Sequence, residues 1–437
     1  MRTTSPARSP RSAAATIKKN LPRNVTGILL FEFTWGLGIP LGLFASMVPA
    51  YLSALGSSKS FIGLANALWT LLVPLQLLGS RLSSGRRRVR TWSALYVGAT
   101  GIRLIYDVFA VFVPGIWTPG SSAGLFVVAC VGYIGLYVTG QSIYMGIVTD
   151  NIPERRRGWL FGMRMLCMGV GGIGMGFVAS WILHHWESPF NYRVSFLAGD
   201  TIWTLSTIIT LFLLRDRPHE SALPAASGYL RALYEKLRVL LANPNYRIFI
   251  FFHGLNIVAL AMSGFIVPYA REKLGVSDQL IAWLSVLFLA SGAVFGIVLG
   301  RLADRVGYRS VGAVQSVLLL FHFAVALGAR SFLAVSVAYT LYSIVNISSA
   351  FVLVNMSVEL CPSISAIDLT ALGGLLLLPV VGAASPIAGR IIDATGSYAA
   401  VFYMGAAIAA VALLGFVLLV REPRTGRLLE TRQIEMR

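Results

Sequence analysis

The sequence predicts an all-α integral membrane protein whose twelve transmembrane helices form two six-helix halves. Three observations indicate this fold class. Of the 437 residues, 56% are apolar and only 12% are charged, whereas soluble domains carry about 25% charged residues. Twelve apolar runs are long enough to cross a membrane, and segments of the first half of the chain recur in the second. Most of the chain therefore faces lipid or other helices instead of water.

Each apolar run has roughly 18 to 25 residues, enough to span a bilayer core of about 30 Å as a helix. Barrel strands would instead alternate apolar and polar residues over about ten positions. In chain order the predicted transmembrane runs are Thr26–Ala50, Phe61–Leu78, Thr91–Val113, Ala123–Val148, Trp159–Leu183, Val194–Leu214, Ile248–Ala270, Leu280–Leu299, Val311–Leu327, Phe332–Val354, Ile367–Ile387 and Ala399–Val420.

The basic residues predict the orientation of these helices. With an even number of helices both termini lie on one side, and the segments on that side hold 28 Lys and Arg residues against 6 in the opposite loops. Because basic residues concentrate on the cytoplasmic side, we expect a multi-pass cell-membrane protein with cytoplasmic termini. The net charge of +18 then reflects topology. The basic residues are spread over six segments and form no single stripe, which argues against a nucleic-acid partner.

The two halves resemble each other in sequence. PAYLSALGSSKSFI from Pro49 and PYAREKLGVSDQLI from Pro268 share five identical residues at a constant offset of 219. A second set of identities, at an offset of 206, matches Tyr192, Phe196 and Gly199 with Tyr398, Phe402 and Gly405. Such internal repetition indicates that the chain contains two copies of one structural unit.

The repeat and the charge pattern together divide the chain. We expect a disordered basic tail over residues 1–25, six helices over 26–214, a cytoplasmic linker over 215–247, six helices over 248–420 and a tail over 421–437. In the linker, LRALYEKLRVLL from Leu230 has helical periodicity and predicts a helix lying on the cytoplasmic surface. Organelle transit peptides share the composition of the first tail, so this alternative stays open.

Between the eighth and ninth runs, Gly300 to Arg309 read GRLADRVGYR, which resembles the signature loop of the major facilitator superfamily. Gly300 would permit close backbone approach and Gly307 a tight turn. Asp304 can cap a helix start and accept from Arg, while Arg305 and Arg309 anchor the loop at the cytoplasmic face. The resemblance implies that Asp304 and Arg305 latch helices together in one gating state.

Other segments extend the resemblance over nearly the whole chain. In the first half, GSRLSSGRRR from Gly79 carries Ser84 where the signature has an acid, and PERRRGWLFGMR from Pro153 and SPIAGRIIDATG from Ser385 are similar to further family segments. The family's fold consists of two parallel six-helix repeats with a substrate site at their interface. Glycines crowd the fifth run from Gly169 to Gly176, as an interface between moving halves would require.

Ionisable residues inside the runs are the candidate coupling and substrate residues, because buried charges in membranes default to functional roles. Glu32 and Arg164 lie at similar depths in the first and fifth runs, which the family resemblance implies are neighbours. They are expected to pair, either functionally or as a structural ion pair. Arg103 and Asp107 sit one turn apart and are expected to neutralise each other, which favours a structural role. Asp200 either faces the central site or reaches the opposite interface.

In the second half, His253 and Asn256 are the further candidates. An imidazole titrates near neutral pH, so His253 is a candidate proton carrier, although a lone His more often hydrogen-bonds to a neighbour. Aromatic and amide side chains in the first half favour an amphipathic organic solute over a bare ion; they are Trp35, Trp69, Gln76, Tyr137, Gln141 and Tyr144.

These features predict a secondary active transporter that moves a small organic solute by alternating access, coupled to protons. A multidrug or metabolite efflux antiporter is the closest alternative, although the fifth run lacks the Gly-Pro pair typical of such antiporters. A transporter-like sensor or scaffold is another. A membrane-embedded enzyme such as a lipid transferase would need clustered His and Asp, which the five scattered His residues do not supply.

We expect a monomer in the lipid bilayer. No cofactor or metal site is expected, since the chain lacks a Walker A pattern and its three Cys residues lack metal-ligand spacing.

Overall fold

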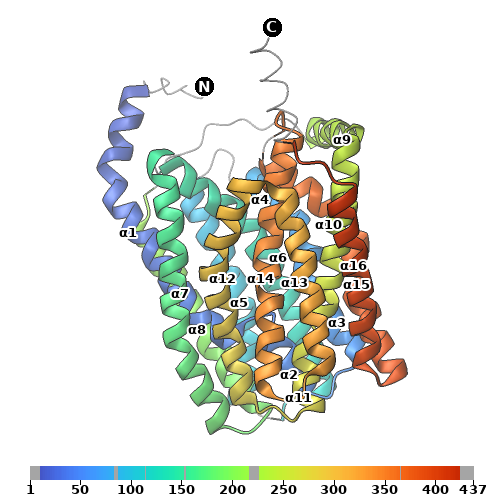
Figure 1. The fold of residues 1–437 in the computed structure, drawn as a ribbon. Coiled ribbons are helices and arrows are strands. Elements are labelled where there is room, and N and C mark those ends of the chain that lie inside the picture. Colours follow the sequence, from blue (N-terminus) through green and yellow to red (C-terminus); the bar gives the residue numbers. More distant parts are fainter. Residues whose placement is uncertain are drawn as a thin grey trace.

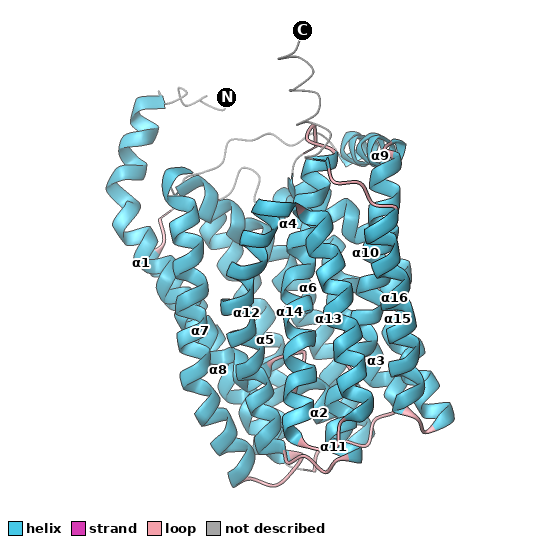
Figure 2. Cartoon of the chain, in the orientation of Figure 1, coloured by secondary structure: helices cyan, strands magenta, loops and turns pink. Residues whose placement is uncertain are grey.

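The computed structural model describes residues 10–82, 87–113, 115–151, 154–215, 226–364 and 366–423. Over these ranges the chain forms helices and no β-strand (Figure 2). Twelve helical segments are long and apolar enough to cross a membrane, one for each predicted run. A bilayer core offers no water to backbone groups, so each segment satisfies its own amides as a helix. The predicted fold class is confirmed.

The amino-terminal half supplies six of the crossing segments. Its helices are α1 (Pro10–Gly42), α2 (Met47–Ala54), α3 (Lys59–Leu72), the short 3-10 helix η1 (Val73–Leu75), α4 (Gln76–Leu82), α5 (Arg88–Phe112), α6 (Pro119–Asn151), α7 (Glu154–His185) and α8 (Phe190–Leu213). The expectation of a disordered tail up to residue 25 is wrong from residue 10 onward, because α1 begins at Pro10. Proline suits the first helical position, and the alanines that follow are strong helix formers.

The remaining helices form the linker and the carboxy-terminal half. They are α9 (Ala226–Ala242), α10 (Pro244–Ser263), α11 (Ile266–Lys273), α12 (Asp278–Val306), α13 (Tyr308–Gly328), α14 (Phe332–Leu360), α15 (Ala366–Thr395) and α16 (Tyr398–Leu418). Figure 1 shows the crossing helices side by side in one bundle, with α2 and α11 at the end opposite α9. We call the end of the bundle that carries α2 and α11 the distal end.

The predicted linker helix is present as α9. In Figure 1 it is seen nearly along its axis, across the end of the bundle where α1 begins and α16 ends. Leu240 is fully buried, and Leu233 and Leu237 pack against the same apolar cluster of the carboxy-terminal half. Tyr234 is 68% exposed on the other side. The leucine spacing therefore attaches one face of α9 to the bundle.

The first and seventh crossing segments are interrupted at equivalent places. α2 and α11 begin 219 residues apart, the offset of the sequence repeat. Pro49 and Pro268 occupy the first turn of these helices, where no amide donor is required. The turns that follow contain Gly56 and Gly275, with φ of 73° and 63°, a left-handed conformation that favours glycine. The repeat is thus a repeat of backbone geometry.

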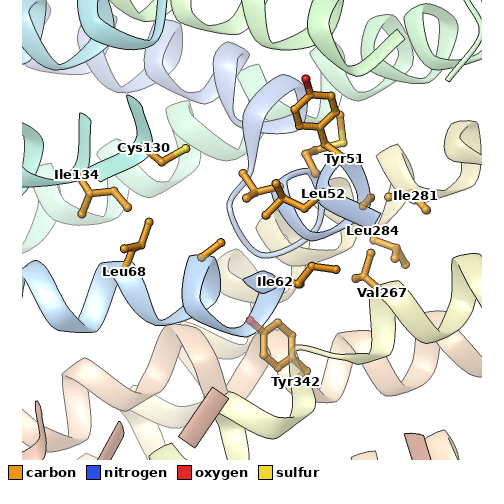
Figure 3. Close-up of a cluster of buried hydrophobic side chains, with 14 of the residues drawn as sticks. Tyr51, Leu52, Ile62, Leu68, Cys130, Ile134, Val267, Ile281, Leu284 and Tyr342 are labelled. Carbon is orange, nitrogen blue, oxygen red and sulfur yellow. The ribbon is translucent and has the colours of Figure 1, made fainter. Parts of the chain in front are cut away.

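The most extensive contacts between the halves are those of α3 with α15 and of α7 with α12. Glycines line both contacts. A Cβ atom at Gly63 would overlap the carbonyl of Ser385, and one at Gly176 would overlap the side chain of Val286. Near the distal end, Figure 3 shows Ile62 of the amino-terminal half in one buried apolar cluster with Val267 and Ile281 of the carboxy-terminal half. The halves therefore meet through close backbone contacts and an apolar core.

Candidate functional site

The ion pair predicted between Glu32 and Arg164 is formed. Arg164 on α7 donates from Nε to Oε1 of Glu32 on α1 at 2.7 Å, and its Nη2 lies 2.6 Å from the same oxygen. Tyr144 on α6 donates to this oxygen at 2.9 Å. Glu32 and Arg164 are only 4% and 3% exposed. The carboxylate of Glu32 and the guanidinium of Arg164 thus form a buried ion pair.

Aromatic rings surround this ion pair. The Tyr144 ring lies 5.2 Å from the guanidinium carbon of Arg164 and stacks on Trp92 with centroids 5.2 Å apart. Further along α1, Trp35 stacks between Tyr137 and Trp203, at 5.4 Å and 5.1 Å. Ring faces attract cations and stack on other planar groups. The arrangement combines a charged pair with ring faces, which suits an amphipathic organic molecule.

The pairing expected for Arg103 is corrected by the structure. Arg103 on α5 forms its ion pair with Asp200 on α8, with 3.0 Å between Nε and Oδ2. Asp107 lies one turn along α5, and its carboxyl group is within hydrogen-bonding reach of that of Asp200. All three residues are fully buried. The spacing placed Arg103 and Asp107 on one face of α5, but α8 packs on that face and brings in a second carboxylate.

The surroundings of Arg103 are mostly aromatic. Its guanidinium carbon lies 5.3 to 5.6 Å from the ring centroids of Phe44, Phe126, Tyr133 and Phe196. Among the described residues, no guanidinium nitrogen of Arg103 has a well-aligned hydrogen bond, nor has any carboxylate oxygen of Asp107 or Asp200. The rings stabilise the cation, while the carboxylates lack donors.

The carboxy-terminal candidates play a different part. Within the described ranges, every buried Asp, Glu and Arg belongs to the amino-terminal half. His253 on α10 is 1% exposed and stacks on Phe249 at 5.5 Å; its ring nitrogens make no hydrogen bond to the described residues. Asn256 donates to the Gly312 carbonyl at 3.1 Å and accepts from Ser316 at 2.8 Å. Asn256 therefore ties α10 to α13.

The signature segment from Gly300 to Arg309 is mostly helix, so the expected loop is wrong. Gly300, Asp304 and Arg305 belong to α12, and Gly307 alone separates α12 from α13. Gly307 has φ 85° and ψ 168°, a conformation that is essentially restricted to glycine; the expected tight turn is confirmed. A Cβ at Gly300 would meet no atom within 4 Å, so no close backbone approach occurs there. Asp304 is in the last turn of a helix and does not cap a helix start.

Arg309 has a defined anchoring role. Its Nε donates to the Phe416 carbonyl at 2.9 Å, and its Nη2 donates to the carbonyl of Val417. These carbonyls belong to the last turn of α16, whose final acceptors have no partner within the helix. The segment therefore ties the start of α13 to the end of α16. Ser84 and Arg86, in the corresponding segment of the first half, lie outside the described residues.

Sequence analysis missed a group of contacts between the halves at the distal end. Glu272 on α11 accepts from Ser53 on α2 at 2.5 Å and lies 2.5 Å from Nζ of Lys59 on α3. Asp278 on α12 accepts from Tyr192 at 2.7 Å and from Asn191 at 3.2 Å, both on α8. In each contact the carboxy-terminal half supplies the carboxylate and the amino-terminal half supplies the donor.

Asp393, near the end of α15, completes this group. It accepts from the backbone amides of Lys59 and Ser60 at 2.7 and 2.8 Å, and so caps α3 from the other half. We call the three carboxylates and these donors the distal cluster. The repeat could have pointed to it, because Lys59 and Asp278 occupy equivalent positions at the offset of 219 and carry opposite charges.

Comparisons with known proteins agree with this architecture. A family model described as Major Facilitator Superfamily matches residues 27–366, and it matches residues 249–435 a second time. The nucleoside transporter NupG, as a mutant, is similar in structure with a TM-score of 0.67 and 15% identity, covering 92% of this chain and 100% of its own. No curated protein sequence matches the chain significantly.

Two further solved structures share the fold. The xylose transporter XylE from E. coli has a TM-score of 0.61 and 14% identity, over 91% of this chain and 98% of its own. A mutant peptide transporter POT in complex with sulfate has a TM-score of 0.66 and 13% identity, over 92% of this chain and 95% of the transporter. With its twelve crossing helices, its repeated halves and a family match over most of its length, this chain belongs to the Major Facilitator Superfamily of membrane transporters.

Proposed function

We propose that this protein is a secondary active transporter that moves a small organic solute across a cell membrane by alternating access, coupled to protons. In alternating access the two six-helix halves tilt against each other around a central site. One chain contains both halves, so a monomer suffices. The excess of Lys and Arg on one side supports cytoplasmic termini. The distal end then faces away from the cytoplasm.

The observation that carries this proposal is the buried Glu32–Arg164 ion pair within a group of aromatic rings. Ionisable residues in the membrane interior are expensive and are retained mainly for binding, coupling or pairing. Here the pair contacts Tyr144, and Trp35, Tyr137 and Trp203 stack nearby. A solute with a polar or charged group and a planar apolar part would match both features.

The contacts between the halves support alternating access. The distal cluster holds the halves together through side chains at their surfaces, such as Lys59 with Glu272, which is 28% exposed. Such partly hydrated pairs are weak enough to break and re-form. The glycine-lined contacts of α3 with α15 and of α7 with α12 keep the helices close while one half tilts against the other.

Uptake into liposomes tests this function. The structural neighbours are named as transporters of nucleosides, xylose and peptides, so uridine, xylose and dialanine form the first panel, with a planar organic cation added for the aromatic rings. We expect accumulation or exclusion of at least one compound only when a pH gradient is imposed, with loss of the effect after a protonophore is added. Movement that the protonophore leaves unchanged would exclude proton coupling.

A pair of variants compares the buried carboxylate with an exposed one. Glu32→Gln removes the buried carboxylate, and we expect it to reduce transport at least tenfold. Glu235→Gln makes the same chemical change on α9, where the side chain is 64% exposed, and should leave transport unchanged. Saturable binding of a panel compound without any movement across the bilayer would favour the sensor or scaffold alternative.

A further inference from the structure

With both of its carboxyl groups ionised, the Arg103 site would carry two negative charges and one positive charge. The guanidinium of Arg103 stays protonated, because an arginine side chain does not lose its proton in proteins. Asp107 and Asp200 would each carry a negative charge as free carboxylates, so the cluster would hold a net charge of −1. All three side chains are fully buried. An uncompensated buried charge is unfavourable, and a buried carboxyl group takes up a proton to avoid it.

Most of the groups packed around Arg103 are uncharged. The elements packed around Arg103 present the rings of Phe44, Phe126, Tyr133 and Phe196. The titratable groups among these neighbours are the phenol of Tyr133 and the thiol of Cys130 on α6. Both are neutral at physiological pH in their ordinary state. A further cation, Arg193 on α8, donates to the Tyr51 hydroxyl and to the Ala110 carbonyl of α5. Among the described residues, no ion pair joins it to Asp107 or Asp200.

The geometry also provides a place for a proton. The carboxyl groups of Asp107 and Asp200 are within hydrogen-bonding reach of each other, yet as carboxylates both are acceptors only and find no well-aligned donor. A proton on one of them would make it the donor to the other. Two carboxyl groups in contact share a single proton for this reason, since two like charges at such a distance cannot both form.

We propose that Asp107 and Asp200 share one exchangeable proton beside Arg103, and that this site carries the proton coupled to transport. This assignment rests on the proposed proton coupling and deepens it by naming the proton site. The charged form of Glu32 already accepts hydrogen bonds from Arg164 and Tyr144, whereas the carboxylates at the Arg103 site have no well-aligned donor among the described residues. The two buried sites then have different roles. The Glu32 site binds the solute, and the Arg103 site binds the proton.

The location of the site indicates how its proton is exchanged. Asp107 and Asp200 lie on different helices, α5 and α8, that pack tightly here. In this arrangement the cluster is sealed and neutral with the proton bound. A conformation that lets water between α5 and α8 would hydrate the second carboxylate, and the proton would leave to that water. Proton release is thereby linked to a change in helix packing.

Infrared difference spectroscopy on the purified wild-type protein, without any solute, tests the site. A protonated carboxyl group gives a C=O band that shifts in D₂O. We expect this band at neutral pH and its loss at alkaline pH. Asp107→Asn and Asp200→Asn should each abolish it. Each variant leaves one carboxylate for Arg103 and so retains a neutral cluster, and either one provides the readout if the other does not fold.

Three controls make the assignment specific. Glu32→Gln and Cys130→Ala should keep the band, and Asp107→Asn with Asp200→Asn combined should lower the unfolding temperature, since Arg103 would be left without a counter-charge. A wild-type protein without the band, a band lost only in Glu32→Gln, or a band that never titrates would each overturn the proposal. Because these spectra require no transport, a failed uptake assay would count against the proposed function alone.

Discussion

Removal of either partner of the Glu32–Arg164 pair should destabilise the protein strongly. Glu32→Gln removes the carboxylate that lies 2.6 Å from the guanidinium of Arg164, a residue that is 3% exposed. Breaking a buried ion pair in this way costs about 3 to 5 kcal/mol, because one buried charge becomes uncompensated. Arg164→Gln strands Glu32 and should cost a similar amount. The double variant strands neither charge, so it should be more stable than both single variants.

Equilibrium unfolding in mixed lipid and detergent micelles measures these free energies. From the single and double variants we expect a coupling free energy of at least about 3 kcal/mol. The exposed Arg231–Glu235 pair on α9 is the matched control, with side chains 83% and 64% exposed. An exposed pair of this spacing contributes only about 0.3 to 0.5 kcal/mol. The same double-variant cycle on α9 should therefore give almost no coupling.

Transport then distinguishes a structural pair from a binding pair. We expect the double variant to recover its stability but not its transport, because the charges that bind the solute are gone. Additive free energies in the cycle would refute the argument that each charge compensates the other. Recovery of both stability and solute movement in the double variant would show that the pair is structural, and the proposed binding role of Glu32 would be wrong.

Further predictions concern the helix junction, the distal cluster and the orientation. Gly307→Ala forces a side chain into a conformation restricted to glycine and should destabilise the protein by about 1 to 3 kcal/mol. Gly300→Ala, in open space within α12, should instead be neutral or stabilising by up to about 1 kcal/mol. Equal unfolding free energies for the two variants would contradict this. Exchanging the charges of Lys59 and Glu272 should preserve uptake better than Lys59→Glu alone, as measured in liposomes; equal losses would argue against their pairing. Reporter fusions at the carboxyl terminus and near Ser122 should report opposite sides of the membrane, and a common side would refute the topology.

The pairing of the buried residues shows where sequence reasoning was sufficient. Glu32 and Arg164 were expected to meet because they lie at similar depths on helices that are neighbours in the family fold, and the ion pair is present. The single-residue junction at Gly307 could not be predicted in this way. The signature was recognised, but helix α12 continues through Asp304 and Arg305, because charged residues in a last turn that reaches water are compatible with a helix.

The sequence by itself determined the twelve crossing helices, the two repeated halves and the surface position of α9. These follow from the length of apolar runs, from identities at a fixed offset and from helical periodicity, all of which act along one chain segment. The tertiary structure alone decided that Arg103 pairs with Asp200, and that carboxylates of one half meet donors of the other at the distal end. Such contacts depend on which faces of distant helices pack together. An i to i+4 spacing fixes the shared face of Arg103 and Asp107 but not the residue that α8 brings to it.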